Sequence, residues 1–302
     1  MTISFVHLHL HTEFSIVDST VRVPQLMEQA AALGMPAVAM TDQSNLFGLV
    51  KFYRKAFSNG VKPLIGIDLR VRNPDEDDRP YELVLLCQDI HGYRNLTRLI
   101  SRMYLEGQHR GAPMVDRSWL DARSTEGLIA LSGGIRGDIG RACIGGKPNL
   151  AEEHLDHWLG VFSDRFYIEV TRLGRSGEEE YLQKSIRLAD ERRVPVVATN
   201  DVRFIKQDDF EAHEARVCIQ DGHMLADAGR PRKYSQQQYL KSAEEMCALF
   251  KDIPVAIHNT VEIARRCNLD LTLGESFLPV FPVPDSQTTE EYLRTESAAG
   301  LD

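Results

Sequence analysis

The sequence His7-Leu8-His9-Leu10-His11-Thr12-Glu13-Phe14-Ser15 decides how the rest of the chain is interpreted. It follows the short run Ile3-Ser4-Phe5-Val6, which predicts a strand, so the three histidines come where that strand ends. Alternation with leucine predicts that His7, His9 and His11 face the same side of the strand. Imidazoles two residues apart can share one metal ion, and the alternative is a strand whose histidines are only hydrogen-bonded or half exposed. The triple alternation favours a metal site, which requires further ligands later in the chain.

The composition is that of a globular protein. The chain has 302 residues, of which 43% are hydrophobic and 26% charged, enough for one large domain or two small ones. Its formal net charge of -9 argues against a protein that coats nucleic acid by charge alone. The sequence contains no apolar run of membrane-spanning length and no secretion signal, and this predicts a cytoplasmic protein without a membrane partner. The five cysteines are scattered without a C-x-x-C motif, which indicates reduced thiols.

Short apolar runs and amphipathic segments alternate along the chain. The runs predict strands at 36–40, 63–68, 82–86, 128–131, 166–170 and 194–198. The amphipathic segments predict helices at 23–33, 49–57, 92–104, 150–162, 178–192, 242–250 and 254–267, with capping boxes that begin at Ser176 and Ser242. At least six repetitions of strand and helix predict an α/β fold with parallel strands joined by right-handed crossovers. A closed or nearly closed barrel suits this number of short buried strands, and a doubly wound sheet is the alternative.

Polar residues follow several of the predicted strands. In a parallel α/β barrel the functional groups gather at the carboxyl ends of the strands. Those ends, and the loop after the first strand, provide imidazoles and carboxylates that suit zinc or manganese. The candidate ligands are His9, His11, Asp18, Asp68 and Asp201. Five such residues can hold one ion but are too few for a cluster of two or three metals.

The composition of the chain changes at Ser276. The stretch Phe277-Leu278-Pro279-Val280-Phe281-Pro282-Val283-Pro284 is extended and rich in proline, and a new helix is predicted to begin at Thr288. We therefore expect a domain over residues 1–275 and, over residues 276–302, a linker with the start of another domain.

The motifs together resemble a known family. The His-rich opening followed by residues 33–42 is similar to the PHP (polymerase and histidinol phosphatase) domain, in the form that opens the alpha subunits of bacterial DNA polymerase III. Further similar stretches are 48–53, 61–66, 198–202, 213–219 and the exit at 277–279, so the resemblance covers essentially the whole chain. It implies a distorted seven-stranded, TIM-like (β/α) barrel, a trinuclear metal site in active relatives, and a polymerase palm that begins near residue 276.

The resemblance can be transferred to the metal site residue by residue. His9, His11, Asp18 and Asp201 match metal positions of the family, and Asp68 stands where a glutamate is usual. Four further positions have lost a metal-binding residue, and these are Gln43, Gly134, Leu173 and Arg203. Arg203 places a fixed positive charge where cations would bind, and it is expected to pair with Asp201 or Asp68 instead. The resemblance therefore implies a degenerate site that holds no metal, or at most one residual zinc or manganese ion.

The resemblance also implies what the chain does. The intact protein would be a DNA-directed DNA polymerase, with magnesium in a polymerase domain outside these residues and with DNA bound through the holoenzyme. This part would be a non-catalytic structural domain with no catalytic or cofactor-binding residue of its own, and it would dock the proofreading exonuclease subunit. One alternative is an active metal-dependent phosphoesterase, either a 3′-5′ exonuclease or a pyrophosphatase. A stand-alone histidinol-phosphate phosphatase is a third and weaker hypothesis.

Two other sequence features have less specific interpretations. The densest basic stretch, Gly229-Arg230-Pro231-Arg232-Lys233-Tyr234, suggests a contact to DNA or to a neighbouring domain, although a surface loop is the default interpretation. His154 and His157 lie one turn apart on a predicted helix among acidic residues, which favours a solvated helix face over a metal site.

Overall fold

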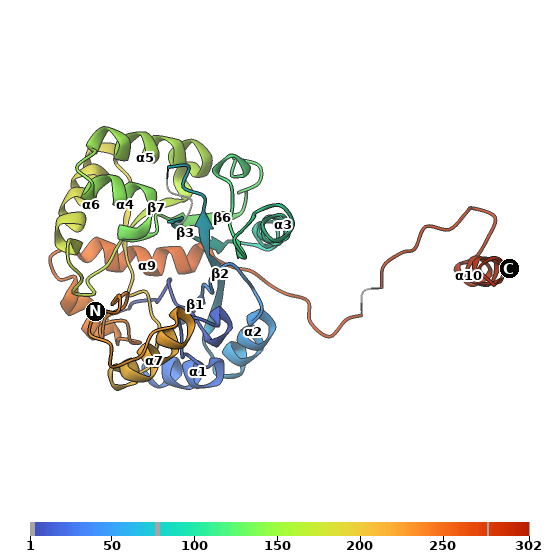
Figure 1. The fold of residues 1–302 in the computed structure, drawn as a ribbon, viewed down its shortest axis with the longest axis horizontal. Helices are drawn as coiled ribbons and strands as arrows, with labels where there is room; N and C mark the ends of the chain where they lie inside the picture. The colour runs from blue at the N-terminus through green and yellow to red at the C-terminus, as the bar shows by residue number, and fades with distance from the viewer. Residues whose placement is uncertain (1–3, 76–78, 277, 302) are drawn as a thin grey trace. The chain divides into compact units, whose positions relative to one another are not determined.

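The computed structural model describes residues 4–75, 79–276 and 278–301, and its contacts divide the chain into the units Met1–Asp270 and Leu271–Asp302. The first unit is an α/β fold, which confirms the fold class expected from the sequence (Figure 1). Its main sheet has the strand order β1-β2-β3-β6-β7-β8. The strands are β1 (Ala37–Met40), β2 (Lys62–Val71), β3 (Tyr81–Cys87), β6 (Leu128–Leu131), β7 (Phe166–Val170) and β8 (Val196–Ala198). A two-residue hairpin, β4 (Gln108–His109) with β5 (Ala112–Pro113), forms a separate small sheet.

Helices follow most of the strands and surround the sheet (Figure 1). The α-helices are α1 (Val23–Ala32), α2 (Leu49–Ser58), α3 (Ile90–Glu106), α4 (Asp138–Ile144), α5 (Pro148–Phe162), α6 (Glu178–Arg192), α7 (Phe210–Asp221), α8 (Ala243–Leu249), α9 (Pro254–Arg266) and α10 (Thr289–Ala299). The short 3-10 helices are η1 (Glu13–Ser15), η2 (Arg117–Trp119), η3 (Gly134–Arg136), η4 (Ser163–Arg165) and η5 (Gln207–Asp209). Within the described part of the chain, no helix has the length and apolar character needed to cross a lipid bilayer.

The His-rich segment closes the sheet. On one side, the backbone N–H groups of Ala39 and Thr41 donate to the carbonyls of His7 and Leu10 over 2.8 and 2.9 Å. On the other side, the N–H of Val202 donates to the carbonyl of His9 over 3.1 Å, beyond the end of β8. The segment thus lies between the two edge strands of the six-stranded sheet, although it pairs through isolated bridges and not as a regular strand. The expected seven-stranded barrel therefore has six strands among the described residues, with the His-rich segment in the seventh place.

The strands are not all parallel, contrary to the prediction. β1 and β2, β6 and β7, and β7 and β8 pair in parallel, but β3 is antiparallel to both β2 and β6. The connection from β2 to β3 runs from residue 72 to 80 and contains no helix in its described part. Parallel neighbours need a crossover of a dozen residues or more, so this short connection returns the chain in the opposite direction.

Two local predictions are wrong. Residues 4–6 form no regular strand, and Ile3 lies outside the described residues. The predicted capping box at Ser176 is absent: the helix covers Glu178–Arg192 as expected, but its N-cap is Gly177, which has a left-handed conformation and no side-chain cap. The capping box at Ser242 is confirmed, because its hydroxyl accepts from the N–H of Glu245 while the Glu245 side chain accepts from the N–H of Ser242.

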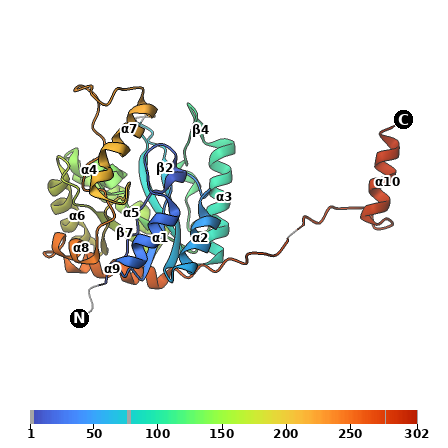
Figure 2. The same cartoon turned by 90° about the horizontal axis from the view of Figure 1, so that it is seen from below.

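Helix α9 packs against the barrel core at the end opposite to the segment that follows α7 (Figure 2). Its residues Ile263 and Ala264, and Cys267 directly after it, join the buried side chains of Val6 and Leu8 in the main apolar cluster. This arrangement leaves the carboxyl ends of the parallel strands at the other end, where the polar residues gather.

Candidate functional site

His9 and His11 lie together at the closed edge of the sheet. Their ring centroids are 5.6 Å apart, and both side chains are buried. His7 points elsewhere, because its Nε2 donates to the carbonyl of Lys241 over 2.9 Å. The backbone bends at His9 between the two bridges, so strict alternation fails here and only two of the three histidines share one space.

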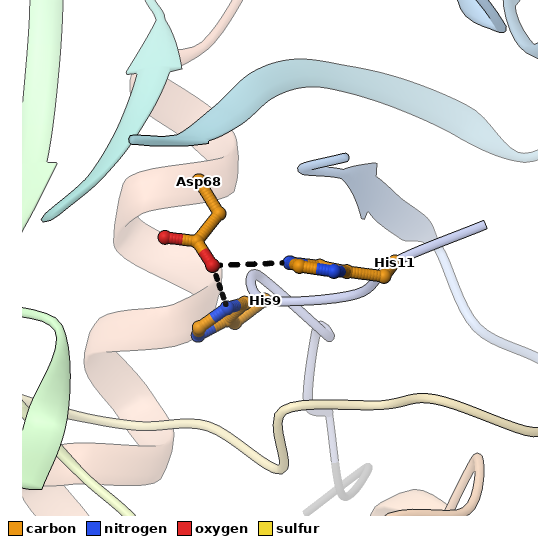
Figure 3. Close-up of side chains that lie close together, drawn as sticks. All are labelled: His9, His11 and Asp68. Atoms are coloured by element: carbon orange, nitrogen blue, oxygen red, sulfur yellow. Dashed lines mark hydrogen bonds and ion pairs between the residues drawn. The ribbon is translucent and has the colours of Figure 1, made fainter. Parts of the chain in front are cut away.

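Asp68 on β2 completes a compact triad with these histidines (Figure 3). Its Oδ2 lies 3.2 Å from Nε2 of His11 and 3.6 Å from Nε2 of His9. One potential ligand atom of each residue lies within 4.8 Å of the other two, and all three residues are buried. The structure thus brings three of the five predicted ligands to within the reach of a single ion.

Glu169 of β7 orients His9, and sequence reasoning missed it. Its Oε1 lies 2.8 Å from Nδ1 of His9 and accepts from Oγ1 of Thr199 over 2.5 Å. The other ring nitrogen of His9 has no hydrogen-bond partner in the described structure and lies 3.6 Å from carboxylates of both Asp68 and Asp201. A carboxylate on the second ring nitrogen is the arrangement that fixes metal-binding histidines. The sequence signal is a single acidic residue inside the apolar run that forms β7.

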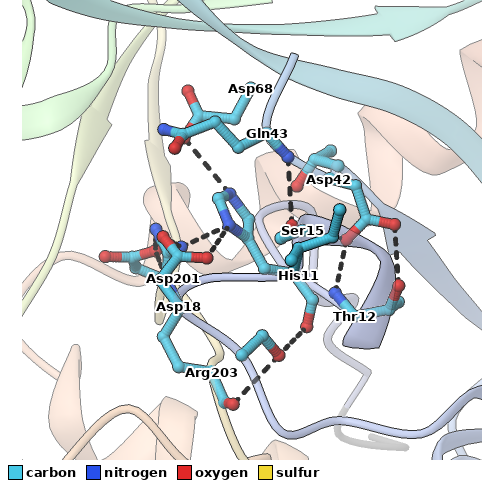
Figure 4. Close-up of polar contacts among 12 residues, drawn as sticks. His11, Thr12, Ser15, Asp18, Asp42, Gln43, Asp68, Asp201 and Arg203 are labelled. Atoms are coloured by element: carbon cyan, nitrogen blue, oxygen red, sulfur yellow. Dashed lines mark hydrogen bonds and ion pairs between the residues drawn. The ribbon is translucent and has the colours of Figure 1, made fainter. Parts of the chain in front are cut away.

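Arg203 occupies the space beside the triad (Figure 4). Its Nε donates to Oδ1 of Asp201 over 2.7 Å, and its Nη1 makes short contacts to Oδ2 of Asp18 and to Nδ1 of His11. The guanidinium is fully buried. Asp18 and Asp201, the two other predicted ligands, are therefore bound to a protein cation.

Further polar side chains hold Asp201. Nη2 of Arg136 donates to its Oδ2 over 2.9 Å, and Nη2 of Arg175 lies 3.5 Å from the same oxygen. Nε2 of Gln238 donates over 2.9 Å to both Oδ2 and the backbone carbonyl of Asp201. Asp201 itself has a φ of +42°, a left-handed backbone conformation that is uncommon outside glycine. These partners come from η3 and from two loops, their spacing carries no recognised motif, and sequence reasoning did not find them.

The loop between α7 and α8 also contributes to the site. The hydroxyl of Tyr234 donates to Oδ2 of Asp18 over 3.2 Å, and the Arg203 guanidinium lies 5.7 Å from the centre of the Tyr234 ring. The predicted basic stretch at 229–234 is therefore only partly a surface loop. Arg230 pairs with Glu214 over 2.5 Å, and Nζ of Lys233 lies 2.6 Å from Asp221.

Asp42 fixes the backbone that follows His11. Its carboxylate accepts from the N–H and the hydroxyl of Thr12 over 2.6 and 2.7 Å, and from the hydroxyl of Ser15 over 2.7 Å. Burial raises the pKa of Asp42, although these donors act in the opposite direction. Asp42 thus holds the turn after the His-rich segment and does not reach the triad.

The carboxylates of the site are held in their charged form. Burial opposes the ionisation of Asp18, but Arg203 and His11 outweigh it and lower the pKa of Asp18. Burial likewise opposes the ionisation of Asp201, and Arg203 with Arg136 holds the pKa of Asp201 well below its usual value. Both aspartates are therefore anions at neutral pH, and each is neutralised by arginine.

The protonation of His9 follows from the same charges. Burial favours the neutral ring, yet Glu169 and Asp201 raise the pKa of His9 well above its usual value. Burial also opposes the ionisation of Asp68, but the hydrogen bond with His11 and the nearby ring of His9 lower the pKa of Asp68. In the absence of a metal, a protonated His9 supplies a positive charge to the triad.

The four positions that the resemblance marks as lost offer no additional metal ligand. Oε1 of Gln43 accepts from Nη2 of Arg70 over 2.5 Å, and Gly134 opens η3 with a φ of +58°. The side chain of Leu173 is buried, and its N–H donates to Glu178. Arg203, the fourth position, neutralises two of the remaining carboxylates.

The donor set fits one divalent ion and not a cluster. Two atoms of the triad, Nε2 of His9 and Oδ1 of Asp68, are buried without a hydrogen-bond partner in the described structure. Such unpartnered atoms are expected where side chains can coordinate a metal ion. Two imidazoles and one carboxylate are suitable ligands for zinc or manganese. A second or third ion would need Asp18 and Asp201, which Arg203 already binds.

The predicted alternative at His154 and His157 is structural. Nδ1 of His154 lies 2.9 Å from Nη1 of Arg117, and the ring of His157 packs edge-on against Trp158 at 4.8 Å. The Arg117 guanidinium beside the His154 ring disfavours a cation at this place, in agreement with the interpretation as a helix face and not a metal site.

The chain is similar to known proteins in sequence and in fold. Residues 7–173 match the PHP domain family. The chain is 53% identical over its whole length to the DNA polymerase III subunit alpha of Pseudomonas fluorescens, and 49% identical over 99% of its length to that of Escherichia coli K12. It spans 26% of the length of each of these relatives. Among solved structures, an amidohydrolase from Chromobacterium violaceum is 16% identical with a TM-score of 0.47, over 70% of this chain and 97% of that one.

Proposed function

Since this chain belongs to the PHP domain family, we propose that it forms the N-terminal PHP domain of a DNA polymerase III alpha subunit. The similarity to such subunits over the full length of the chain supports this proposal. The intact protein would extend a primer by nucleotidyl transfer, with magnesium in a polymerase domain that lies outside these residues. The boundary would lie near residue 276, where the proline-rich stretch leads towards the palm.

Arg203 is the observation that carries the proposed role of this domain. A buried guanidinium that pairs with Asp18 and Asp201 supplies internally the positive charge that ions would otherwise supply. Breaking such a pair leaves an uncompensated buried charge, so the network stabilises the closed edge of the barrel. The domain would then act as a structural support for the polymerase core and not as a hydrolase.

The triad can still hold one ion. His9, His11 and Asp68 would bind a residual zinc or manganese ion, with Glu169 fixing the orientation of His9. When bound, such an ion would act as a Lewis acid towards a phosphate ester and would favour deprotonation of a nearby water. The unpartnered Nε2 of His9 is the specific observation that favours this second candidate function, a metal-dependent phosphoesterase.

The proposed partners follow from the family assignment. The remaining domains of the same chain, DNA held by the holoenzyme, and a proofreading exonuclease subunit would contact this domain in the cytoplasm. In the C-terminal unit the side chains of Leu278 and Val280 are 86% and 95% exposed, and Phe281 is 59% exposed. A run of exposed apolar side chains supports a segment that packs against another part of a longer protein.

Metal analysis combined with hydrolysis assays tests the proposal. The purified chain should contain at most one equivalent of zinc or manganese. It should show neither 3′-5′ exonuclease nor pyrophosphatase activity that a chelator abolishes and that His9→Ala reduces. Stoichiometric zinc or manganese with chelator-sensitive turnover would instead establish the phosphoesterase. Exposed His258→Ala is the matched control, since its ring lies on the surface of α9.

A further inference from the structure

Helix α2 exposes apolar side chains on the outside of the barrel, where it lies between α1 and α3 (Figure 1 and Figure 2). Val50 and Phe57 are 46% and 60% exposed, and Phe47, in the turn before the helix, is 62% exposed. Positions seven apart lie on the same face of a helix, so Val50 and Phe57 point outward together. Single exposed apolar side chains are normal on a protein surface, whereas several on one element mark a contact surface.

The surroundings of the two phenylalanines are ordered before any partner binds. The backbone N–H of Phe47 donates to Oδ1 of Asn45 over 3.0 Å, which fixes the backbone of the turn. The ring of Phe57 packs edge-on against the ring of Tyr53, with the centroids 4.8 Å apart. Aromatic side chains on an ordered element lose little conformational freedom when they become buried, and they are therefore suitable anchors for an interface.

Arg54 determines which kind of partner fits this face of α2. It lies four residues after Val50 and three before Phe57, so its side chain belongs to the same face. Lys51 and Lys55 pair with glutamates over 2.9 and 3.9 Å, whereas Arg54 forms no ion pair with a carboxylate among residues 4–75, 79–276 and 278–301. A buried and unpaired charge is strongly unfavourable, so a partner that covers Arg54 must supply a carboxylate.

The chain leaves its first unit beside this helix. The unit Met1–Asp270 ends at Asp270, and the hydroxyl of Tyr53 on α2 donates to Oδ1 of that aspartate over 3.0 Å. Nζ of Lys62, at the start of β2, donates to Oδ1 of Asn268 over 2.8 Å. The polypeptide that follows residue 270 is therefore tethered at α2. A tethered segment binds intramolecularly at a high effective concentration, which favours it over a separate protein.

We propose that the α2 stripe, defined as Phe47, Val50, Arg54 and Phe57, docks a later segment of the same polypeptide that carries apolar side chains and at least one carboxylate. The chain spans 26% of the length of its relatives, so a longer protein of this kind has ample sequence to supply the segment. A second copy of the chain fits less well, because α2 has no acidic residue to pair with Arg54. The inference rests on the proposed function, in which further domains follow this one.

Cysteine labelling of the intact polypeptide tests this inference. Ser58→Cys places a thiol at an exposed position directly after Phe57, and mass spectrometry of its peptide measures the rate of maleimide labelling. The intact polypeptide should label about tenfold more slowly at this position than the 302-residue chain, because a docked surface must open before it reacts. The matched control is Arg187→Cys, since Arg187 is 82% exposed on α6 and should label at the same rate in both proteins.

Variants of Arg54 test the predicted carboxylate. In the intact polypeptide with Ser58→Cys, Arg54→Glu should restore labelling to within about twofold of the rate in the 302-residue chain, because like charges that meet in an interface repel. Arg54→Lys keeps the positive charge and should retain most of the protection. Thermal unfolding of the 302-residue chain should be unchanged by either substitution, since Arg54 is exposed and has no carboxylate partner in the described structure.

Four outcomes would overturn the inference. Equal labelling of Ser58→Cys in both proteins would show that α2 stays exposed. Protection that appears only after addition of the exonuclease subunit would assign the surface to a separate protein, and protection of the 302-residue chain that increases with its concentration would assign it to a second copy. Full protection in a folded Arg54→Glu variant would exclude the carboxylate. Template-directed synthesis by the intact polypeptide, measured separately, shows whether the proposed function has failed instead.

Discussion

Arg203 donates from Nε to Oδ1 of Asp201 over 2.7 Å, although only one residue separates them in the chain. The left-handed backbone of Asp201, with a φ of +42°, accompanies the turn that brings both side chains to the same side. Arg203 then reaches Asp18, which is 185 residues away in sequence, so one side chain connects the two edges of the barrel.

Replacing Arg203 should destabilise the fold strongly. Arg203→Met leaves Asp18 and Asp201 buried without their main cation, and loss of one partner of a buried pair costs about 3 to 5 kcal/mol in the free energy of unfolding. Urea denaturation followed by circular dichroism measures this change. Arg192→Met is the control, because Arg192 pairs with Glu152 and Asp156 at the surface and should change stability by less than about 1 kcal/mol. Equal effects of the two substitutions would contradict the role given to Arg203.

Removing the positive charge and restoring imidazoles should increase metal binding. In the double variant Arg203→His, Gln43→His, Asp18 and Asp201 are freed from the guanidinium and two new ligands face the triad. We expect the variant to retain more zinc after dialysis than the wild-type chain, measured by mass spectrometry of the metal. Gln43→His alone is the control, since Arg203 still binds both aspartates in it. Unchanged metal content in the double variant would show that Arg203 does not exclude ions.

Glu169→Gln should lower the pKa of His9. Burial disfavours the protonated ring, and the Glu169 carboxylate is the largest of the charges that raise the pKa well above its usual value. The stabilisation from protonated His9 is present below the unfolded pKa and is lost as pH rises through the raised folded pKa. NMR titration of the His9 ring proton measures the change directly. A His9 pKa that is the same in the variant and the wild-type chain would rule out this electrostatic control.

His7 should make the fold sensitive to mild acid. Burial lowers its pKa from 6.5 to about 4, so the unfolded chain binds more protons than the folded chain between these values. Stability contributed by neutral His7 is therefore present above pH 6.5 and is lost as pH falls towards 4, by about 3 kcal/mol in total. His7→Gln, compared with exposed His258→Gln, should flatten the dependence of the urea midpoint on pH in this window. A slope equal to that of the wild-type chain would exclude His7 as its cause.

The sequence predicted the fold class and most helix and strand positions because these depend on local periodicity. It did not predict the antiparallel β3, since strand direction depends on how the chain returns between residues 72 and 80. It placed the first strand wrongly because the histidine segment pairs through isolated bridges with both edges of the sheet, a tertiary arrangement that alternation cannot reveal.

The candidate site was predicted in the same uneven way. His9, His11 and Asp68 follow from spacing and from strand ends, and the pairing of Arg203 with Asp201 follows from charge. Glu169 and Arg136 come from distant elements, and only the folded barrel brings them to the same place. A lone acidic residue in an apolar strand, as at Glu169, is the sequence signal that would have been informative.

The pairing of the His-rich segment with Val202 has a consequence during protein synthesis. Barrel closure joins residues 192 positions apart, so it must wait until the ribosome has made the later residue. At about 5 to 20 residues per second, this delay lasts roughly 10 to 40 seconds, during which the buried face of the nascent barrel is open. Covering the early strands during this interval would therefore matter more for the yield of this domain than for its final stability.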